Sequence, residues 1–475
     1  MKKRIAAIVI CCMLAFCIAA CASKKNTPSG ETPSDSVSAS HSAGKRQTPT
    51  GNPSPSGIGS SSSTPGTAKP SSTNSGKTPF SEASATSGES SPTGSYVIKD
   101  PEGDDPSGPI ILPDPGEPTV TFSTEGGFYG SPFHLTLSAD SGYTIYYTMD
   151  GTDPKKNGKK YSTPILIERS IGSAGALTKS IAASFGYSPP ASQITGTVIK
   201  AYATKGGSKT DTITNTYIVS SSFTSTYQLP CVSLSLAPND FATKSGIYVS
   251  VMDHPFDPKE RKIAFCEMFD KNGKKVSGQY VELSMNGNGS LGFLQKSMRV
   301  YFKKDANPDA SNNPGKLKYD IFGGRVKDAN GNTITSYKRL VLRNSGNDNT
   351  SSMLRDALMQ RLSRELNVDI MEAQPAMIFV NGEFWGLYNI RERYDTNFMA
   401  HYGVAEENIV MLEAPSPLIT GNGTSPYVLN DGEAGDEIPF HNLINYAKSH
   451  NLSVKSYYDH VAAQLDLDNL IDFYI

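Results

Sequence analysis

Gly287-Asn288-Gly289-Ser290-Leu291-Gly292 is the stretch that decides the fold, and it has the spacing G-x-G-x-x-G. On its own the spacing is a weak signal, because a glycine-rich hairpin turn often produces it. Segments of strand character flank it at Gln279–Ser284 and Ser297–Phe302. No helix follows, so the strand–turn–helix fingerprint of dinucleotide-binding domains is excluded.

Two basic residues, Lys296 and Arg299, lie at the start of the second flanking strand. A glycine loop between two strands, followed by a fixed cation, is the arrangement with which protein kinases cover nucleotide phosphates. The pattern therefore gives Gly287, Gly289 and Gly292 as candidate nucleotide-binding residues together with both cations. Lys296 is the leading phosphate contact, and a solvated strand lysine is the alternative interpretation.

The elements after the loop keep the order of a kinase small lobe. A helix is predicted where leucines repeat every four residues, with Thr350 or Ser351 as N-cap. Asn381-Gly382 predicts a tight hairpin between strands at 376–380 and 384–390. The repeated leucines are Leu354, Leu358, Leu362 and Leu366.

Two acidic residues in this region are further candidates for the nucleotide site. Asp356, on the predicted helix, would be the acidic partner of the phosphate-binding cation, although an aspartate in a first helical turn is also explained by the helix dipole. Glu392 follows the last hairpin strand, where a kinase chain crosses beside the nucleotide to its large lobe. Arg343, Asn347, Asp348 and Arg355 either brace the loop or touch ligand.

The rest of this region predicts a mixed α+β domain. Strands are expected at 231–236, 246–251, 262–269 and 338–343, and helices at 440–450, 454–465 and 467–475. The last helix reaches Ile475 without a cap, so we expect the natural chain to continue.

Upstream, residues 119–219 predict an all-β sandwich, because short alternating runs are separated by turn residues. The predicted strands are 119–122, 133–137, 144–148, 164–167, 197–203 and 215–219.

The first 118 residues predict export. Lys2, Lys3 and Arg4 precede a short apolar stretch, and Ile18-Ala19-Ala20-Cys21 resembles a bacterial lipobox, so residues 1–21 are a lipoprotein signal peptide and Cys21 receives lipid. The alternative is an ordinary secretory signal cleaved near Ala22. Residues 22–118 are rich in Ser, Thr, Pro and Gly and predict a disordered tether.

Composition narrows the remaining choices. With 44 basic and 46 acidic residues the formal charge is -2, which gives no reason to expect a nucleic-acid partner. Cys231 and Cys266 could form a disulfide or remain buried free thiols. No H-E-x-x-H or folded G-x-S-x-G motif is present, and the segment beginning at Asp328 departs from a calcium loop and predicts a surface turn.

Several motifs then occur in a recognisable order: Leu229-Pro230-Cys231-Val232-Ser233-Leu234, Lys296-Ser297, Asn344-Ser345-Gly346-Asn347-Asp348-Asn349-Thr350, Leu354-Arg355-Asp356-Ala357-Leu358, Pro375-Ala376 and Asn381-Gly382-Glu383-Phe384-Trp385-Gly386-Leu387-Tyr388-Asn389-Ile390-Arg391-Glu392-Arg393. Together they closely resemble the spore coat protein H (CotH) kinase family, over residues 227–475. The resemblance implies an atypical protein-kinase fold, C-terminally truncated here, that uses ATP and Mg or Mn to phosphorylate proteins. It also implies that the catalytic carboxylates lie beyond Ile475, so we expect no phosphate transfer by these 475 residues alone.

The chain departs from that family at three positions. Gly289 and Leu291 lie where the family loop often carries Ser and Arg, and Asn349 lies where Trp is frequent, so the contact with phosphate is expected to differ. Upstream, three motifs stand out: Tyr146-Tyr147-Thr148-Met149-Asp150-Gly151-Thr152-Asp153-Pro154, Tyr161-Ser162-Thr163-Pro164-Ile165 and Val198-Ile199-Lys200-Ala201-Tyr202-Ala203. With them, residues 119–219 resemble the chitobiase/β-hexosaminidase C-terminal-like domain, a fibronectin-III-like module, with an insertion at 172–196. That resemblance implies a spacer, with a cell-wall glycan as a further candidate partner.

Two functions follow as expectations. The first is a membrane-anchored, extracytoplasmic kinase acting on surface or coat proteins. The second is a non-catalytic surface lipoprotein with a degenerate kinase-like domain beside a glycan-associated sandwich.

Overall fold

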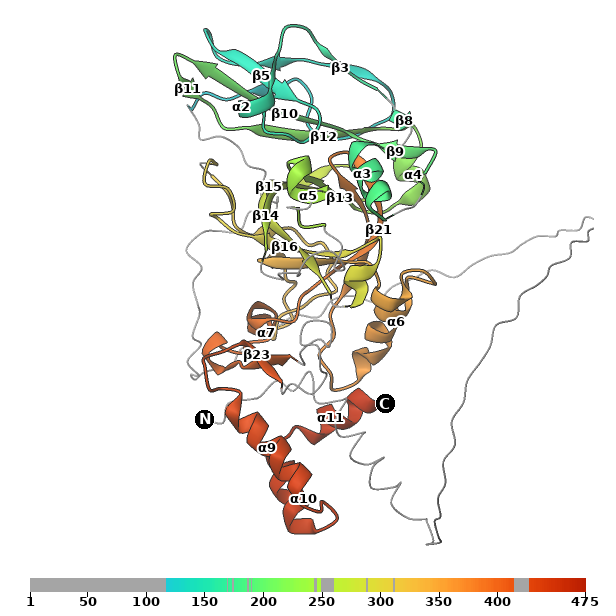
Figure 1. Ribbon diagram of the computed structural model, residues 1–475, viewed down its shortest axis with the longest axis vertical. Helices are drawn as coiled ribbons and strands as arrows, with labels where there is room; N and C mark the ends of the chain where they lie inside the picture. Colours follow the sequence, from blue (N-terminus) through green and yellow to red (C-terminus); the bar gives the residue numbers. More distant parts are fainter. Residues whose placement is uncertain are drawn as a thin grey trace, which may run out of the picture. The chain divides into compact units, whose positions relative to one another are not determined.

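The structure is a computed structural model, and it describes residues 117–168, 170–172, 175–185, 188, 190–242, 246–248, 260–287, 289–310, 312–413 and 427–475. These residues belong to one compact unit (Figure 1). The predicted signal peptide, Cys21 and nearly all of the tether lie outside the described residues. Within the described ranges, no helix is both long and apolar enough to cross a membrane.

Residues 117–219 form a β-rich domain. Its main sheet has the order β2-β12-β10-β5-β6, with β11 on β10, while β1 pairs with β4 and β3 with β7. The strands are β1 Thr121–Phe122, β2 Gly127–Tyr129, β3 Phe133–Leu135, β4 Leu137–Ser138, β5 Thr144–Thr148, β6 Lys159–Lys160, β7 Ile165–Ile167, β8 Ser170–Gly172, β9 Gln193–Thr195, β10 Thr197–Lys205, β11 Ser208–Lys209 and β12 Ile213–Val219.

This domain is not all β as the sequence pattern predicts, because it contains two helices. In α2 (Pro154–Asn157) the side chain of Asp153 accepts a hydrogen bond from Lys155 N and proline occupies the first turn, where its missing N–H costs nothing. The longer α3 (Ala176–Phe185) lies in the predicted insertion, between β8 and β9. Its apolar residues belong to a different core from that of the surrounding strands.

The second part contains a closed barrel of seven strands. Its order is β19-β16-β15-β14-β13-β20-β21, and pairing of β19 with β21 closes the ring. All neighbours are antiparallel except β13 and β20, which run parallel. The strands are β13 Cys231–Ser235, β14 Lys262–Phe269, β15 Lys275–Asn286, β16 Ser297–Phe302, β19 Arg339–Arg343, β20 Ala373–Val380 and β21 Glu383–Arg391.

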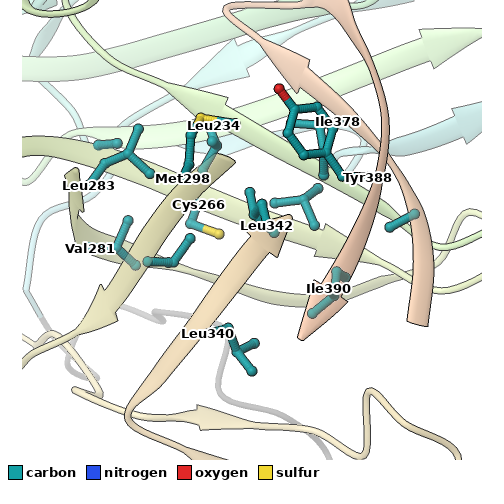
Figure 2. Close-up of a cluster of buried hydrophobic side chains, with 14 of the residues drawn as sticks. Leu234, Cys266, Val281, Leu283, Met298, Leu340, Leu342, Ile378, Tyr388 and Ile390 are labelled. Carbon is teal, nitrogen blue, oxygen red and sulfur yellow. The ribbon is translucent and has the colours of Figure 1, made fainter. Parts of the chain in front are cut away.

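Alternate residues of these strands point into the barrel and fill it. Figure 2 shows Val281 and Leu283 of β15 packed with Met298 of β16, Leu340 of β19 and Ile390 of β21. Because side chains alternate with period two, the residues between them face outward. The barrel interior is therefore an apolar core, and any chemistry on these strands belongs to the outer wall or to the barrel ends.

Short elements complete the fold, and the last helices match the predicted positions closely. They are α4 Phe223–Tyr227, α5 Pro238–Ala242, η1 Gly289–Gly292, β17 Leu317–Lys318, β18 Ser336–Tyr337, η2 Gly346–Asp348, α6 Arg355–Leu362, η3 Ser363–Glu365, α7 Thr396–His401, η4 Glu406–Asn408, β22 Met411–Glu413, β23 Val428–Asp431, α9 Ile438–Ser449, α10 Lys455–Ala462 and α11 Leu467–Tyr474. The described residues 246–248 are not in a strand, contrary to the prediction, and 249–251 lie outside the described residues.

The leucine-rich helix differs from its prediction in two ways. Helix α6 begins after Leu354, and the carboxylate that accepts its first N–H belongs to Asp348, which lies before both predicted N-caps. Leu354, Leu358 and Leu362 are each more than half exposed. The spacing of the leucines predicted the helix correctly, but these side chains do not lie in the core.

Two local predictions are resolved by the structure. Asn381 and Gly382 have φ of 48° and 80°, as a two-residue hairpin of this type requires, and the hairpin is confirmed. Cys231 and Cys266 are buried free thiols on neighbouring strands. Burial raises the pKa of both thiols far above their ordinary value.

Candidate functional site

The glycine loop connects β15 to β16 and folds back on itself. Gly287 has a φ of +124°, and a side chain there would collide with Ser290 Oγ, so this position requires glycine. Gly289 to Gly292 form the short helix η1, whereas the space beside Gly292 is open. Leu291 is buried in the barrel core, so this side chain faces away from any ligand.

Lys296 is buried, with only 1% of its surface exposed, and it braces the loop from below. Its amino group donates hydrogen bonds to the backbone oxygens of Leu291 and Phe293, the latter at 3.0 Å, and lies 5.1 Å from the centre of the Tyr248 ring. Burial lowers the pKa of Lys296 to about 8. The alternative of a solvated strand lysine is therefore wrong.

Lys296 directly precedes β16 and Arg299 lies three residues later, on that strand, so continued alternation places their side chains on opposite faces. Lys296 shares its face with Met298, which is in the core, while Arg299 lies on the outer wall, where its Nε donates to Asn286 Oδ1 at 2.6 Å. The two cations that the sequence suggests as joint phosphate contacts are thus separated by the sheet. Of these two cations, only Arg299 lies on the outer wall of the barrel.

Two further arginines, Arg343 of β19 and Arg391 of β21, join the outer wall to helix α6. Arg299 is paired in register with Val341 of β19, and Val341 with Arg391 of β21. Asp356 of α6 accepts from Arg343 Nε at 2.6 Å and from Arg391 Nη1 at 2.5 Å. Among the described residues Asp356 forms no ion pair with Lys296, so the predicted Lys296–Asp356 pair is replaced by a carboxylate between two arginines.

The loop between β19 and α6 holds both parts of this arrangement in place. Asn344 donates from Nδ2 to Gln295 O at 2.5 Å and exchanges hydrogen bonds with the Ser297 hydroxyl, which ties this loop to the glycine loop. Asp348 accepts from Ser352 Oγ and Arg355 N, and these hydrogen bonds hold its pKa at about 2. These residues brace the site instead of projecting from it.

Glu392 lies just after β21 and is 3% exposed. Its Oε2 accepts from Glu372 N at 3.0 Å, and its Oε1 has no hydrogen-bond partner among the described residues. Burial raises the pKa of Glu392 to about 7; the hydrogen bond from Glu372 N opposes the rise, and the nearby Glu372 carboxylate adds to it. The carboxyl is therefore directed into the protein, at the joint between the barrel and the segment leading to α7.

Stability should consequently fall with rising pH because of Glu392. Between about pH 4.5 and 7 the folded chain retains a proton on Glu392 that the unfolded chain has lost, so unfolding becomes easier as pH rises. Glu392→Gln should remove this slope and raise the free energy of unfolding above pH 7 by up to roughly 3 kcal/mol. Urea unfolding at pH 5 and pH 8 measures this, and an unchanged slope in the variant would contradict it.

Tyr301 marks a further concentration of positive charge on the outer wall. The guanidinium groups of Arg261, Arg339 and Arg393 lie 3.9, 5.8 and 5.7 Å from its ring centre. Asp395, which caps α7, pairs with Arg339 at 3.0 Å. The wall that carries Arg299 and Arg343 is therefore a cation-rich surface in a chain of nearly balanced charge.

The side chains that could bind the phosphates of a nucleotide lie on this outer wall. Arg299 and Arg343 remain partly exposed, and guanidinium forks suit phosphate oxygens. Within the described ranges no group of three or more His, Cys, Asp or Glu side chains could hold a metal ion. The Asp328 carboxylate instead accepts from Asn330 N and Asn332 N of its own turn, which confirms the predicted surface turn.

Comparison with known families finds one match in each part of the chain. Residues 283–475 match the family described as CotH kinase protein, and residues 133–217 match the family described as Fn3 associated. The chain therefore contains a CotH kinase family domain preceded by an Fn3-associated domain. A comparison with curated proteins finds no match.

Sequence reasoning missed the central role of Arg343 and did not single out Arg391. Arg343 directly follows the core residue Leu342, and Arg391 directly follows the core residue Ile390, so both arginines point to the outer face. Period-two alternation, applied from the apolar positions outward, would have placed them with Arg299 and separated them from Lys296.

Proposed function

We propose that these residues form the nucleotide-binding part of an atypical protein kinase that transfers phosphate from ATP to proteins. The observation that carries the proposal is the ion pair of Arg343 with Asp356, which joins the strand after the glycine-loop hairpin to the helix that follows. In protein kinases an ion pair between those two elements fixes the cation that contacts the phosphates. Membership of residues 283–475 in the CotH kinase family supports the same activity.

Each part of the site has a separate role in this proposal. ATP, with its divalent metal, supplies the phosphoryl group. Arg343, held by Asp356, and Arg299 would neutralise phosphate charge from the outer wall, while the backbone of Gly287 to Gly292 would cover the phosphates. Lys296 keeps that backbone in place from the other face through Leu291 and Phe293.

The nucleotide part of the proposal is tested by thermal unfolding with ATP and Mg²⁺. At a hundredfold excess over the dissociation constant, ATP should stabilise the protein by about 2.7 kcal/mol. Arg299→Ala should remove most of that gain and change the stability of the free protein little, because Arg299 has a neutral partner, Asn286, among the described residues.

Lys209→Ala, an exposed position on β11, is the control for general loss of positive charge. A wild-type shift that Arg299→Ala leaves intact would remove Arg299 from the site, and absence of any wild-type shift would overturn nucleotide binding. Lys296→Ala is unsuitable for this purpose, because the buried lysine also supports the loop.

We further propose that the kinase acts outside the cytoplasm, anchored to the membrane by lipid on Cys21, with surface or coat proteins as substrates. The lipobox Ile18-Ala19-Ala20-Cys21 and the Ser/Thr/Pro/Gly-rich stretch after it support this location. A tether of that composition would hold the folded part away from the membrane while leaving it free to reach neighbouring proteins.

A non-catalytic surface protein is the second candidate. A cavity of about 470 Å³ lies between the two domains, lined by Lys200 and Asp211 of the first and by Tyr280 and Asp309 of the second, among others. Carboxylates and ammonium groups are nearly balanced in it, and aromatic rings are present, a combination suited to an uncharged polar ligand such as a glycan. Glycan binding without ATP binding would favour this candidate.

A further inference from the structure

The insertion in the Fn3-associated domain is bound to the barrel of the kinase family domain. Strand β9 pairs with β21 through Thr195 and Glu383, and Gly196 N donates to Gly382 O at 2.7 Å. The Glu383 carboxylate accepts from Leu177 N and Thr178 N, both at 2.9 Å, and from Thr178 Oγ1 at 2.6 Å. A buried carboxylate of one domain thus caps the first turn of helix α3 in the other.

The apolar side of α3 is part of the barrel core. Leu177 and Ile181 are buried in the same cluster as Leu291 of the glycine loop and Met298 of β16. The core of their own domain, which contains Leu135 and Ile199, is a separate cluster. By packing, α3 belongs to the kinase family domain although the chain places it inside the Fn3-associated domain.

Three aromatic rings lie between α3 and the loop lysine. The Trp385 ring meets Phe241 at 5.1 Å and Tyr248 at 5.4 Å, and Phe241 stacks on Tyr248 at 5.2 Å. Phe241 is on α5, which contacts α3, where Ser180 Oγ donates to Ala242 O. On the far side of this group, the Lys296 amino group lies over the Tyr248 ring.

We propose that helix α3 is a positioning element for the glycine loop, so that the Fn3-associated domain sets the geometry of the phosphate-covering backbone. The contacts form a continuous packed series from Glu383 and α3, through Phe241, Tyr248 and Trp385, to Lys296 and the loop oxygens that it holds. Dense cores respond to displacement as units, so release of α3 shifts the rings against which Lys296 is held. This inference deepens the proposed kinase function and rests on it only for its effect on ATP.

The capping interaction provides the test, and Trp385 provides the reporter, because it is the single tryptophan of the chain. Glu383→Gln removes the charge that two backbone N–H groups and the Thr178 hydroxyl share. Amide hydrogen exchange should accelerate in residues 176–185 and also in 289–296, and the Trp385 emission should shift to longer wavelength. The dissociation constant of ATP should rise by about fivefold or more, the lower end of typical coupling between sites.

A milder pair of variants protects the test against general unfolding. Thr178→Val removes one hydrogen bond to Glu383 and should give the same changes at smaller amplitude, while Thr178→Ser keeps the hydroxyl and should restore the wild-type signals. Glu125→Gln, an exposed position in the same domain, is the matched control.

Faster exchange confined to α3, with an unchanged loop and unchanged Trp385 emission, would overturn the inference. The exchange and fluorescence readouts need no nucleotide. If the wild-type protein did not bind ATP, the proposed kinase function would fail while coupling of α3 to the loop could still be measured and decided.

Discussion

Asp356→Ala should lower the free energy of unfolding by roughly 3 kcal/mol, because it removes the counterion of a buried arginine. Arg391 is 1% exposed, and its Nη1 lies 2.5 Å from Asp356 Oδ2. An uncompensated buried guanidinium is costly, whereas the loss of the partly exposed Arg343 pair contributes little. Since 27% of the Asp356 side chain is exposed, water offsets part of the loss, and the lower end of the range for buried pairs applies.

Chemical denaturation of the variant and the wild type measures this difference. Asp356→Asn keeps an acceptor for Arg391 and should cost less than Asp356→Ala. The double variant Asp356→Ala with Arg391→Met removes the stranded charge and should recover much of the loss. A double variant no more stable than Asp356→Ala alone would show that packing, and not the buried charge, dominates at this position.

ATP binding should weaken in Asp356→Ala beyond what the stability change explains. Without Asp356, the Arg343 side chain loses the partner that fixes its direction, and an arginine must be held in place to contact phosphate effectively. Titration at a temperature where both proteins are fully folded separates the two effects.

Local patterns in the sequence predicted the strands well where they are apolar and bounded by turn residues. Strands β14 and β16 have the predicted limits, at 262–269 and 297–302. The Asn381-Gly382 turn was predictable because few residue pairs accept positive φ at both positions. These features depend on neighbours in the chain, so the sequence contains their causes locally.

The barrel and the exposed stripe of α6 could not be predicted in the same way. Closure depends on the pairing of Val341 with Arg391, fifty residues apart, and nothing local marks those two positions as partners. The leucines of α6 have helical spacing, yet which face of a helix is covered depends on its neighbours in space. Nor did the insertion between β8 and β9 reveal that α3 packs into the other domain.

The candidate site shows the same division. The backbone at Gly287 requires glycine, and Arg299 lies on the wall where a ligand could be reached, while the nucleotide contacts of both stay predictions. Lys296 and Glu392 were chosen for their places along the chain, and the structure directs both side chains into the protein. Burial of a charged side chain is a tertiary property, set here by Tyr248 and by the segment around Glu372.

Glu267→Ala should also be strongly destabilising, by roughly 3–5 kcal/mol, because it strands a buried lysine at the contact between the two domains. Glu267 is fully buried on β14, and Lys275 Nζ lies 2.8 Å from its carboxylate. The same carboxylate accepts from Thr216 Oγ1 of β12 in the Fn3-associated domain, and that hydroxyl also meets Ser233 Oγ of β13 at 2.8 Å. One substitution therefore breaks an ion pair on the outer wall of the barrel and a hydrogen bond between the domains.

Calorimetry of the folded chain is the measurement. The wild type should unfold in a single transition, since the buried contacts of Glu267 and of Glu383 couple the two domains. In Glu267→Ala the Fn3-associated domain should unfold first, so the calorimetric trace should contain two transitions. A spacer domain without such contacts would give two transitions in the wild type as well. Glu282→Gln, which alters partly exposed ion pairs with Arg261 and Lys303, should cost no more than about 1 kcal/mol. Equal losses of unfolding free energy in the two variants would show that burial of Glu267 between the domains adds nothing to stability. Two transitions in the wild type would show that the Fn3-associated domain is a spacer.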